Sequence, residues 1–132
     1  MGFLDFFGKK PVRGFLFDLQ ASVHPFRLAA HRSDAVDLEV SITNASDQPQ
    51  LTSVTIVVPC VLGLDRTGLM HEREVRLGTL QPGEQKRFKA GVFSNQKSAA
   101  GTYALQVFAS AHYRDYGHLL NQVRIKVPVR VA

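Results

Sequence analysis

Residues 36–44 alternate apolar and polar side chains without interruption, and this is the clearest structural pattern in the chain. Such a period of two is typical of a strand with one face on a core and the other in water. The strand is followed by residues 44–49, which are rich in types that favour turns. The apolar residues that would share the inner face are Val36, Leu38, Val40 and Ile42.

The same rhythm continues to the end of the chain. A second strand begins at Leu51, and further strands are predicted over residues 72–80, 85–93, 102–112 and 121–131. Residues 19–28 alternate more loosely and contain Pro25, which predicts an edge strand or a kink between two half-strands. Seven to eight short strands separated by turns predict an all-β, immunoglobulin-like antiparallel β-sandwich. The residues expected to be most buried are Leu38, Val40, Ile42, Val54, Ile56, Leu105 and Val107.

Three segments resemble a known family: Leu-Glu-Val-Ser-Ile-Thr-Asn at 38–44, Leu-Gly-Thr-Leu-Gln-Pro-Gly-Glu at 77–84, and Gly-Thr-Tyr-Ala-Leu-Gln-Val at 101–107. They are similar to prokaryotic immunoglobulin-like and fibronectin type III-like domains, in particular the cell-adhesion-related domain of bacterial and archaeal proteins. The resemblance covers residues 18–132 and implies the fold alone, because its motifs specify turns and core positions. It also implies a structural role for Tyr103, whose hydroxyl would bond to nearby backbone while the ring packs inside.

Length and composition indicate one folded domain, because 132 residues with 45% hydrophobic content can bury a sizeable core. The net charge of +5 is moderate, and no run of five basic residues occurs, so no nucleic-acid partner is expected. The single cysteine, Cys60, cannot form an intramolecular disulfide, and its apolar surroundings predict a buried, inert thiol. No secretory signal or transmembrane pattern is recognised, which favours a cytoplasmic location.

The N-terminal segment, residues 1–17, differs from the predicted sandwich domain of residues 18–132 because it carries five of the nine phenylalanines. Three interpretations remain open. The segment folds back onto the sandwich, it anchors the chain to a membrane surface, or it docks on a partner or second subunit. The residues that would do so are Phe3, Leu4, Phe6, Phe7, Lys9 and Lys10.

The sequence gives little support for a metal site or a catalytic site. His112 and His118 flank one loop, but two imidazoles without a third ligand make a weak site, and Cys60 has no histidine within a short turn. No Gly-x-Ser-x-Gly motif and no phosphate-binding glycine loop occurs. We therefore expect no cofactor, no metal, no small-molecule substrate and no enzymatic activity.

Two surfaces are candidates for recognition. The first is the loop between the last two strands, because loops at the end of a rigid sandwich commonly carry binding residues; alternatively, its tyrosines simply pack on the sandwich end. The second is an outward face beside the predicted core residues of the same strands. The loop residues are His112, Tyr113, Arg114, Asp115 and Tyr116, and the face residues are Val57, Phe108, Arg124 and Lys126.

The function predicted from these patterns is a non-enzymatic protein-interaction or structural module that self-associates or binds a protein partner. The first alternative is a peripheral membrane adaptor that uses the N-terminal segment. The second alternative is a metal-binding or redox sandwich protein.

Overall fold

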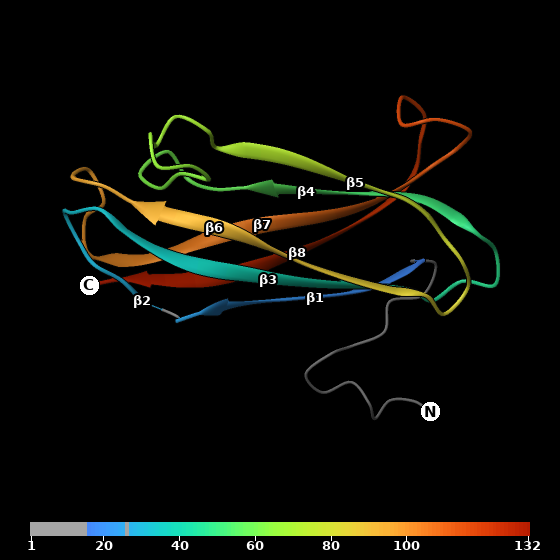
Figure 1. Ribbon diagram of the computed structural model, residues 1–132, viewed down its shortest axis with the longest axis horizontal. Helices are drawn as coiled ribbons and strands as arrows, with labels where there is room; N and C mark the ends of the chain where they lie inside the picture. The colour runs from blue at the N-terminus through green and yellow to red at the C-terminus, as the bar shows by residue number, and fades with distance from the viewer. Residues whose placement is uncertain (1–15, 26) are drawn as a thin grey trace.

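Two β-sheets face each other in the computed structural model, which describes residues 16–25 and 27–132 (Figure 1). A three-stranded sheet has the order β1-β3-β6 and a five-stranded sheet the order β2-β8-β7-β4-β5. The described strands are β1 Phe17–His24, β2 Arg27–Leu28, β3 Asp34–Asn44, β4 Gln50–Val57, β5 Glu72–Leu80, β6 Gln85–Ser94, β7 Gly101–His112 and β8 Leu119–Val131. This is the immunoglobulin-like sandwich that the alternation predicts.

The core lies between the sheets and is built from the inward positions of each strand. β3 is the middle strand of its sheet, and Val40 stands opposite Ala21 on β1 and Phe88 on β6. The residues predicted to be most buried are all in the core: Leu38, Val40, Ile42, Val54, Ile56, Leu105 and Val107. The register predicted from the sequence is therefore confirmed, because a slip by one residue would have exposed all of them.

The break at Pro25 divides the first predicted strand between the two sheets. β1 pairs antiparallel with β3, whereas β2 pairs in parallel with the end of β8, where Leu28 stands beside Val131. A proline cannot donate a ladder hydrogen bond, so the chain leaves one sheet there and joins the other. The predicted kink between two half-strands is confirmed.

Asn44 joins the two sheets at one end of the sandwich. Its side-chain amide donates to the carbonyl oxygens of Gln48 and Leu80, at 2.8 and 2.9 Å, and its side-chain oxygen accepts from the Ser46 N–H at 2.9 Å. Because buried polar groups are costly unless they are bonded, this buried asparagine fixes the β3–β4 turn against the end of β5. The turn that contains Gly83, with φ 80°, lies at the same end.

Tyr103 has the structural role that the family resemblance implies. Its hydroxyl donates to the backbone carbonyl of Ala99 at 2.8 Å, and its ring packs against the core. The bond closes the turn before β7 onto the strand.

Cys60 corrects one prediction, because its thiol is exposed rather than buried. β4 ends at Val57, and the chain passes through Pro59 into the loop of residues 58–71 before it reaches the cysteine. The inward alternation of β4 ends with Val58, which is still buried. The alternation of inward and outward residues predicts burial only within a strand, and Cys60 lies beyond the end of β4.

Candidate functional site

The β7–β8 hairpin ends in a tip, residues 113–118, that projects from one end of the sandwich (upper right in Figure 1). His112, at the end of β7, pairs with Leu51 on β4 and with Leu119 on β8. The tip therefore grows directly from β7, the central strand of the five-stranded sheet, and from its neighbour β8. These paired strands supply an ordered base for the tip.

Hydrogen bonds within the tip fix its shape. The Tyr113 N–H donates to the His118 carbonyl at 2.8 Å, and the Gly117 N–H donates to the Asp115 carboxylate at 2.9 Å. The same carboxylate lies 2.7 Å from Nδ1 of His118, and Arg114 takes a positive φ of 70° to make the turn. The hydrogen bond from His118, followed by that from Gly117, lowers the pKa of Asp115 below its ordinary value.

Tyr116 folds back from the tip onto the sandwich. Its hydroxyl accepts a 3.0 Å hydrogen bond from the Gly78 N–H on β5. The Arg76 guanidinium lies 4.6 Å from the centre of its ring, and the His112 ring meets it edge to face at 5.1 Å. These contacts anchor the tip on β5 as well as on β4 and β8.

His112 and Ser53 form a buried pair beneath Tyr116. Nε2 of His112 lies 2.7 Å from the Ser53 hydroxyl oxygen, and the two residues are only 8% and 1% exposed. Nδ1 of His112 is buried and has no hydrogen-bond partner. A serine and a histidine in contact would suggest a nucleophile, but among the described residues no carboxylate bonds to the ring, and the Ser53 side chain is buried. The pair therefore acts as a structural support for the tip.

Three large apolar side chains of the hairpin remain exposed: Tyr113 at 55%, Leu119 at 58% and Leu120 at 57%. Ala111 pairs with Asn121 and His112 with Leu119, so Leu120 is an extra residue in β8 and forms a β-bulge. The Arg114 guanidinium lies 5.2 Å from the centre of the Tyr113 ring. The hairpin thus presents an apolar surface with one cation beside it, and we call Tyr113, Arg114, Leu119 and Leu120 the tip surface.

The structure divides the five predicted loop residues into two groups. Tyr113 and Arg114 point to solvent, whereas His112, Asp115 and Tyr116 hold the loop in place. The packing on the sandwich is therefore seen at Tyr116, whereas recognition through Tyr113 and Arg114 stays a prediction. The leucines at 119 and 120 were missed, although two adjacent leucines at the start of a strand cannot both face the core.

The second predicted surface is assembled on the outer face of the five-stranded sheet. Phe108 stands opposite Arg124, and Gln106 opposite Val57 and Lys126, so all the predicted residues share one face. Val57 and Phe108 are both half-buried, and Phe108 is a diagonal neighbour of Val57. Whether this face receives the N-terminal segment stays a prediction, because Phe3, Leu4, Phe6, Phe7, Lys9 and Lys10 lie outside the described residues.

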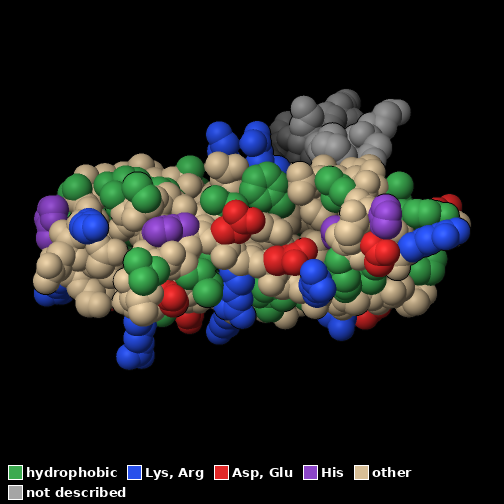
Figure 2. All heavy atoms as spheres, turned by 90° about the horizontal axis from the view of Figure 1, so that it is seen from above, with side chains coloured by type: hydrophobic (Ala, Val, Ile, Leu, Met, Phe, Trp, Pro, Cys, Tyr) green, Lys and Arg blue, Asp and Glu red, His purple; other side chains and the backbone are tan. Residues whose placement is uncertain are grey.

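The described residues outside the tip surface offer few other candidates for a functional site. Leu69 and Met70 form a second exposed apolar pair, in the loop of residues 58–71 at the opposite end of the sandwich. Within residues 16–25 and 27–132, no group of three or more metal-ligating side chains occurs and no helix could span a bilayer. On the face seen in Figure 2, hydrophobic, basic and acidic side chains are interspersed, so no field of a single sign forms there.

Comparison with known proteins supports the fold alone. No protein-family model and no curated protein matches the sequence. Among solved structures, the fold is similar to immunoglobulin-like domains, including the CARDB domain of the PF1109 protein from Pyrococcus furiosus. That domain has a TM-score of 0.53 at 16% identity, over 97% of this chain and 99% of that chain.

Two further structures have comparable scores. BslA, a bacterial hydrophobin, has a TM-score of 0.51 at 15% identity, over 88% of this chain and 93% of that chain. The Pseudomonas fluorescens alkylpurine DNA glycosylase AlkC has a TM-score of 0.52 at 16% identity, over 86% of this chain. The matched region is only 31% of the glycosylase. At these identities the likenesses define a shared sandwich architecture and not a shared activity.

Proposed function

We propose that this chain is a non-enzymatic, immunoglobulin-like interaction module that binds a protein partner through the tip surface. The observation that carries the proposal is the combination of exposure and rigidity. Tyr113, Leu119 and Leu120 are more than half exposed on a hairpin whose shape is fixed by its own hydrogen bonds. A surface that is already ordered loses little conformational entropy when it binds.

The energetics favour an anchor rather than a complete interface. Fully burying a large apolar side chain contributes about 1.5–3 kcal/mol, whereas association itself costs about 4–15 kcal/mol. Three such side chains therefore supply the central contacts of an interface, and surrounding surface must supply the rest. Arg114 lies beside them and suits a partner carboxylate, with which a guanidinium forms two parallel hydrogen bonds.

We expect no nucleophilic chemistry from the Ser53–His112 pair. It is the described serine–histidine contact nearest to the tip surface, and its hydroxyl is 1% exposed. A nucleophile must reach its substrate, and this hydroxyl is buried.

The direct test places a photo-crosslinking amino acid at position 120 in living cells. A matched probe at Lys97, an exposed position in the loop at the opposite end, serves as the control. We expect a discrete protein adduct from position 120, none from position 97, and loss of the adduct when Leu119→Ser is added. Dimers of this chain in the adduct would identify the partner as a second copy.

A second measurement separates a protein partner from a membrane. Wild type, Leu119→Ser/Leu120→Ser and the matched pair Leu69→Ser/Met70→Ser are compared by sedimentation with vesicles of mixed neutral and anionic lipid. The proposal expects no vesicle binding that depends on the tip surface. Vesicle binding that only the tip variant loses, without a protein adduct from position 120, would replace the interaction module by a membrane adaptor.

A further inference from the structure

The outer edge of β6 is open over most of its length. β3 pairs with one side of β6 from end to end, and on the other side the described residues supply a single bridge. In that bridge Gly63 and Phe93 exchange both backbone hydrogen bonds, at 2.9 and 2.8 Å. Backbone groups alternate between the two sides of an antiparallel strand, so those of Gly91, Lys89 and Arg87 point to the same open side. The loop of residues 58–71 thus pairs with the outer edge of β6 as an added strand would, but only at Gly63.

The charges along this edge are of one sign. The ionisable residues of β6 are Lys86, Arg87 and Lys89, and all are exposed cations. Nζ of Lys89 lies 3.5 Å from the Glu39 carboxylate, whereas Lys86 and Arg87 have no ion-pair partner among the described residues. The open edges of β5 and β1 differ, because β5 mixes glutamates with arginines and β1 carries Asp18. β8, which β2 pairs only at Arg130 and Val131, also carries cations alone, but Pro128 removes an N–H donor from that strand. The β6 edge therefore combines cations with a strand that has no proline.

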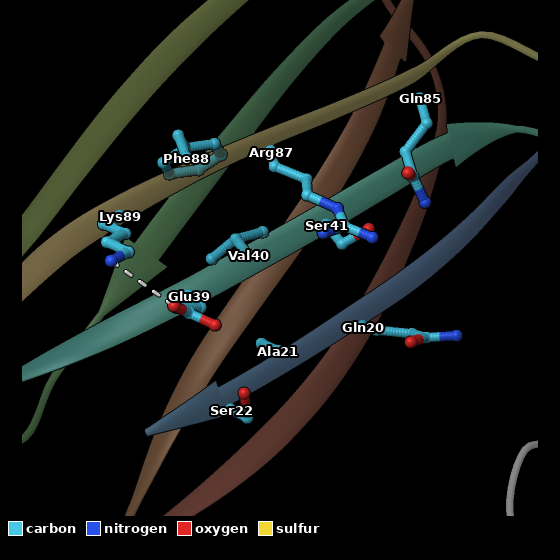
Figure 3. Close-up of a pocket in the computed structure, with 10 residues that line it drawn as sticks. All are labelled: Gln20, Ala21, Ser22, Glu39, Val40, Ser41, Gln85, Arg87, Phe88 and Lys89. Carbon is cyan, nitrogen blue, oxygen red and sulfur yellow. Dashed lines mark ion pairs between the residues drawn. The ribbon is translucent and has the colours of Figure 1, made fainter. Parts of the chain in front are cut away.

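The Arg87 side chain makes no ion pair with the described residues. Figure 3 shows it lying across β3 toward Ser41, in a hollow of about 560 Å³ on the outer face of the three-stranded sheet. The hollow is also lined by the uncharged side chains of Gln20, Ser41 and Gln85 and by the ion pair of Glu39 with Lys89. Because Arg87 makes no ion pair among the described residues, its guanidinium can turn toward the β6 edge without breaking one.

We propose that the β6 edge binds an acidic peptide segment, which adds as an extended strand and places carboxylates opposite Arg87 and Lys89. Strand addition of this kind takes its affinity from main-chain hydrogen bonds and its specificity from alternate side chains. Residues directly opposite one another in such a pair have Cβ atoms about 4.5–5.5 Å apart, so an acidic residue there meets the cation. The surface is separate from the tip surface, and the proposal does not depend on it.

Charge disfavours two occupants that this chain itself could supply. Pairing β6 with β6 of a second copy would set cations opposite cations, which is destabilising. Residues 1–15 carry Lys9, Lys10 and Arg13 against the single acid Asp5, so they match the edge poorly. The remaining alternative is that the cations merely prevent strand pairing, a common protection of sheet edges.

The test measures fluorescence anisotropy of a labelled synthetic peptide in which glutamate alternates with threonine or valine. Three matched peptides accompany it: one with glutamine for glutamate, and two that are N-methylated at alternate residues in either register. We expect the acidic peptide to bind and the glutamine peptide to bind at least about tenfold more weakly. N-methylation should abolish binding in the register that faces β6 and leave it in the other. Hydrogen exchange should show that the bound peptide protects the amides of Arg87 and Lys89.

Protein variants complete the test. Arg87→Gln/Lys89→Gln should weaken binding at least about tenfold, whereas Arg124→Gln/Lys126→Gln, which removes two exposed cations from the other sheet, should change it less than about twofold. Arg87→Glu/Lys89→Glu should bind the lysine version of the peptide instead. No binding of the acidic peptide, or binding that both N-methylated peptides retain, overturns the proposal. Self-association of the glutamine variant without peptide binding by the wild type assigns the cations to edge protection alone.

Discussion

Nε2 of His112 lies 2.7 Å from the hydroxyl oxygen of Ser53, and this contact joins the end of β7 to β4 directly beneath the hairpin tip. The other ring nitrogen is buried without a partner. The histidine therefore depends on one hydrogen bond for its polar contacts, while Tyr116 covers its ring. Because the tip surface rests on this cluster, the stability of the Ser53–His112 pair bears on the proposed partner binding as well as on folding.

Ser53→Ala removes the only hydrogen-bond partner of a buried imidazole. We expect it to lower the free energy of unfolding by about 1–3 kcal/mol, the cost of leaving a buried polar group unsatisfied. The chain contains its own control, because the Ser22 hydroxyl and the His24 ring form the same type of contact at 2.9 Å in an exposed position. Ser22→Ala should cost less than about 0.5 kcal/mol in the same urea titrations. Equal losses for the two variants would show that burial is not what makes the inner pair important.

The lowered pKa of Asp115 predicts that the order of the tip depends on pH. Its pKa in the folded protein is lowered below 3.8, first by the hydrogen bond with His118 and then by that with Gly117. A lowered folded pKa means that the carboxylate stabilises the tip fully above its unfolded value, and that this contribution is lost as the pH falls through the folded value. Acidification below about pH 4 should therefore release the Gly117 amide, which NMR titration can follow.

Asp115→Asn supplies the control for that titration. The variant should lose the acid step at Gly117, because an asparagine does not ionise in this range. Asp65, whose pKa is lowered mainly by a hydrogen bond from Thr67 at the other end of the sandwich, should still release its own loop at low pH. A step at Gly117 that persists in Asp115→Asn would assign the transition to another group.

The alternation along β4 makes a sharp prediction about packing. Ile56 faces the core and is completely buried, whereas its neighbour Val57 lies half-buried on the outer face. Ile56→Ala should lower the free energy of unfolding by about 2–4 kcal/mol through lost burial and a residual cavity. Val57→Ala should cost less than about 1 kcal/mol, because the outer face has no core to empty. Urea melts that rank the two the other way would contradict the register.

The fold could be predicted because it depends on local, periodic information. Three features follow from the types of residue at each position and take the predicted form. They are the strict alternation of β3, the break at Pro25 and the turn around Gly83. Alternation reports only on residues within a strand, however. It failed at Cys60, which lies beyond the end of β4.

The tip surface was harder to predict because it depends on contacts between distant segments. Tyr113 and Tyr116 are similar in the sequence, but Tyr116 meets the Gly78 N–H and the Arg76 guanidinium on β5, which no local pattern connects to it. The bulge at Leu120 likewise follows from how β7 pairs with β8. The open edge of β6 required the strand order, which alternation alone does not determine.

The N-terminal segment provides the last prediction. Phe3, Phe6, Phe7 and Phe15 are too much aromatic surface to leave in water, since burying each ring contributes about 1.5–3 kcal/mol. A deletion should stop at residue 15, because Phe17 is the first residue of β1 and is buried in the core. If the segment docks on the outer face around Val57 and Phe108, removing residues 1–15 should lower the melting temperature or change the oligomeric state.

The same deletion should also expose an apolar patch that binds a hydrophobic dye. Phe108→Ser in the shortened chain should then reduce dye binding, whereas Leu69→Ser, which removes an exposed leucine elsewhere, should not remove the newly exposed patch. An unchanged melting temperature, mass and dye binding would show that the segment does not dock on the sandwich. Sedimentation of the full chain, but not the shortened one, with anionic vesicles would then favour the membrane anchor, because the segment combines apolar rings with Lys9 and Lys10.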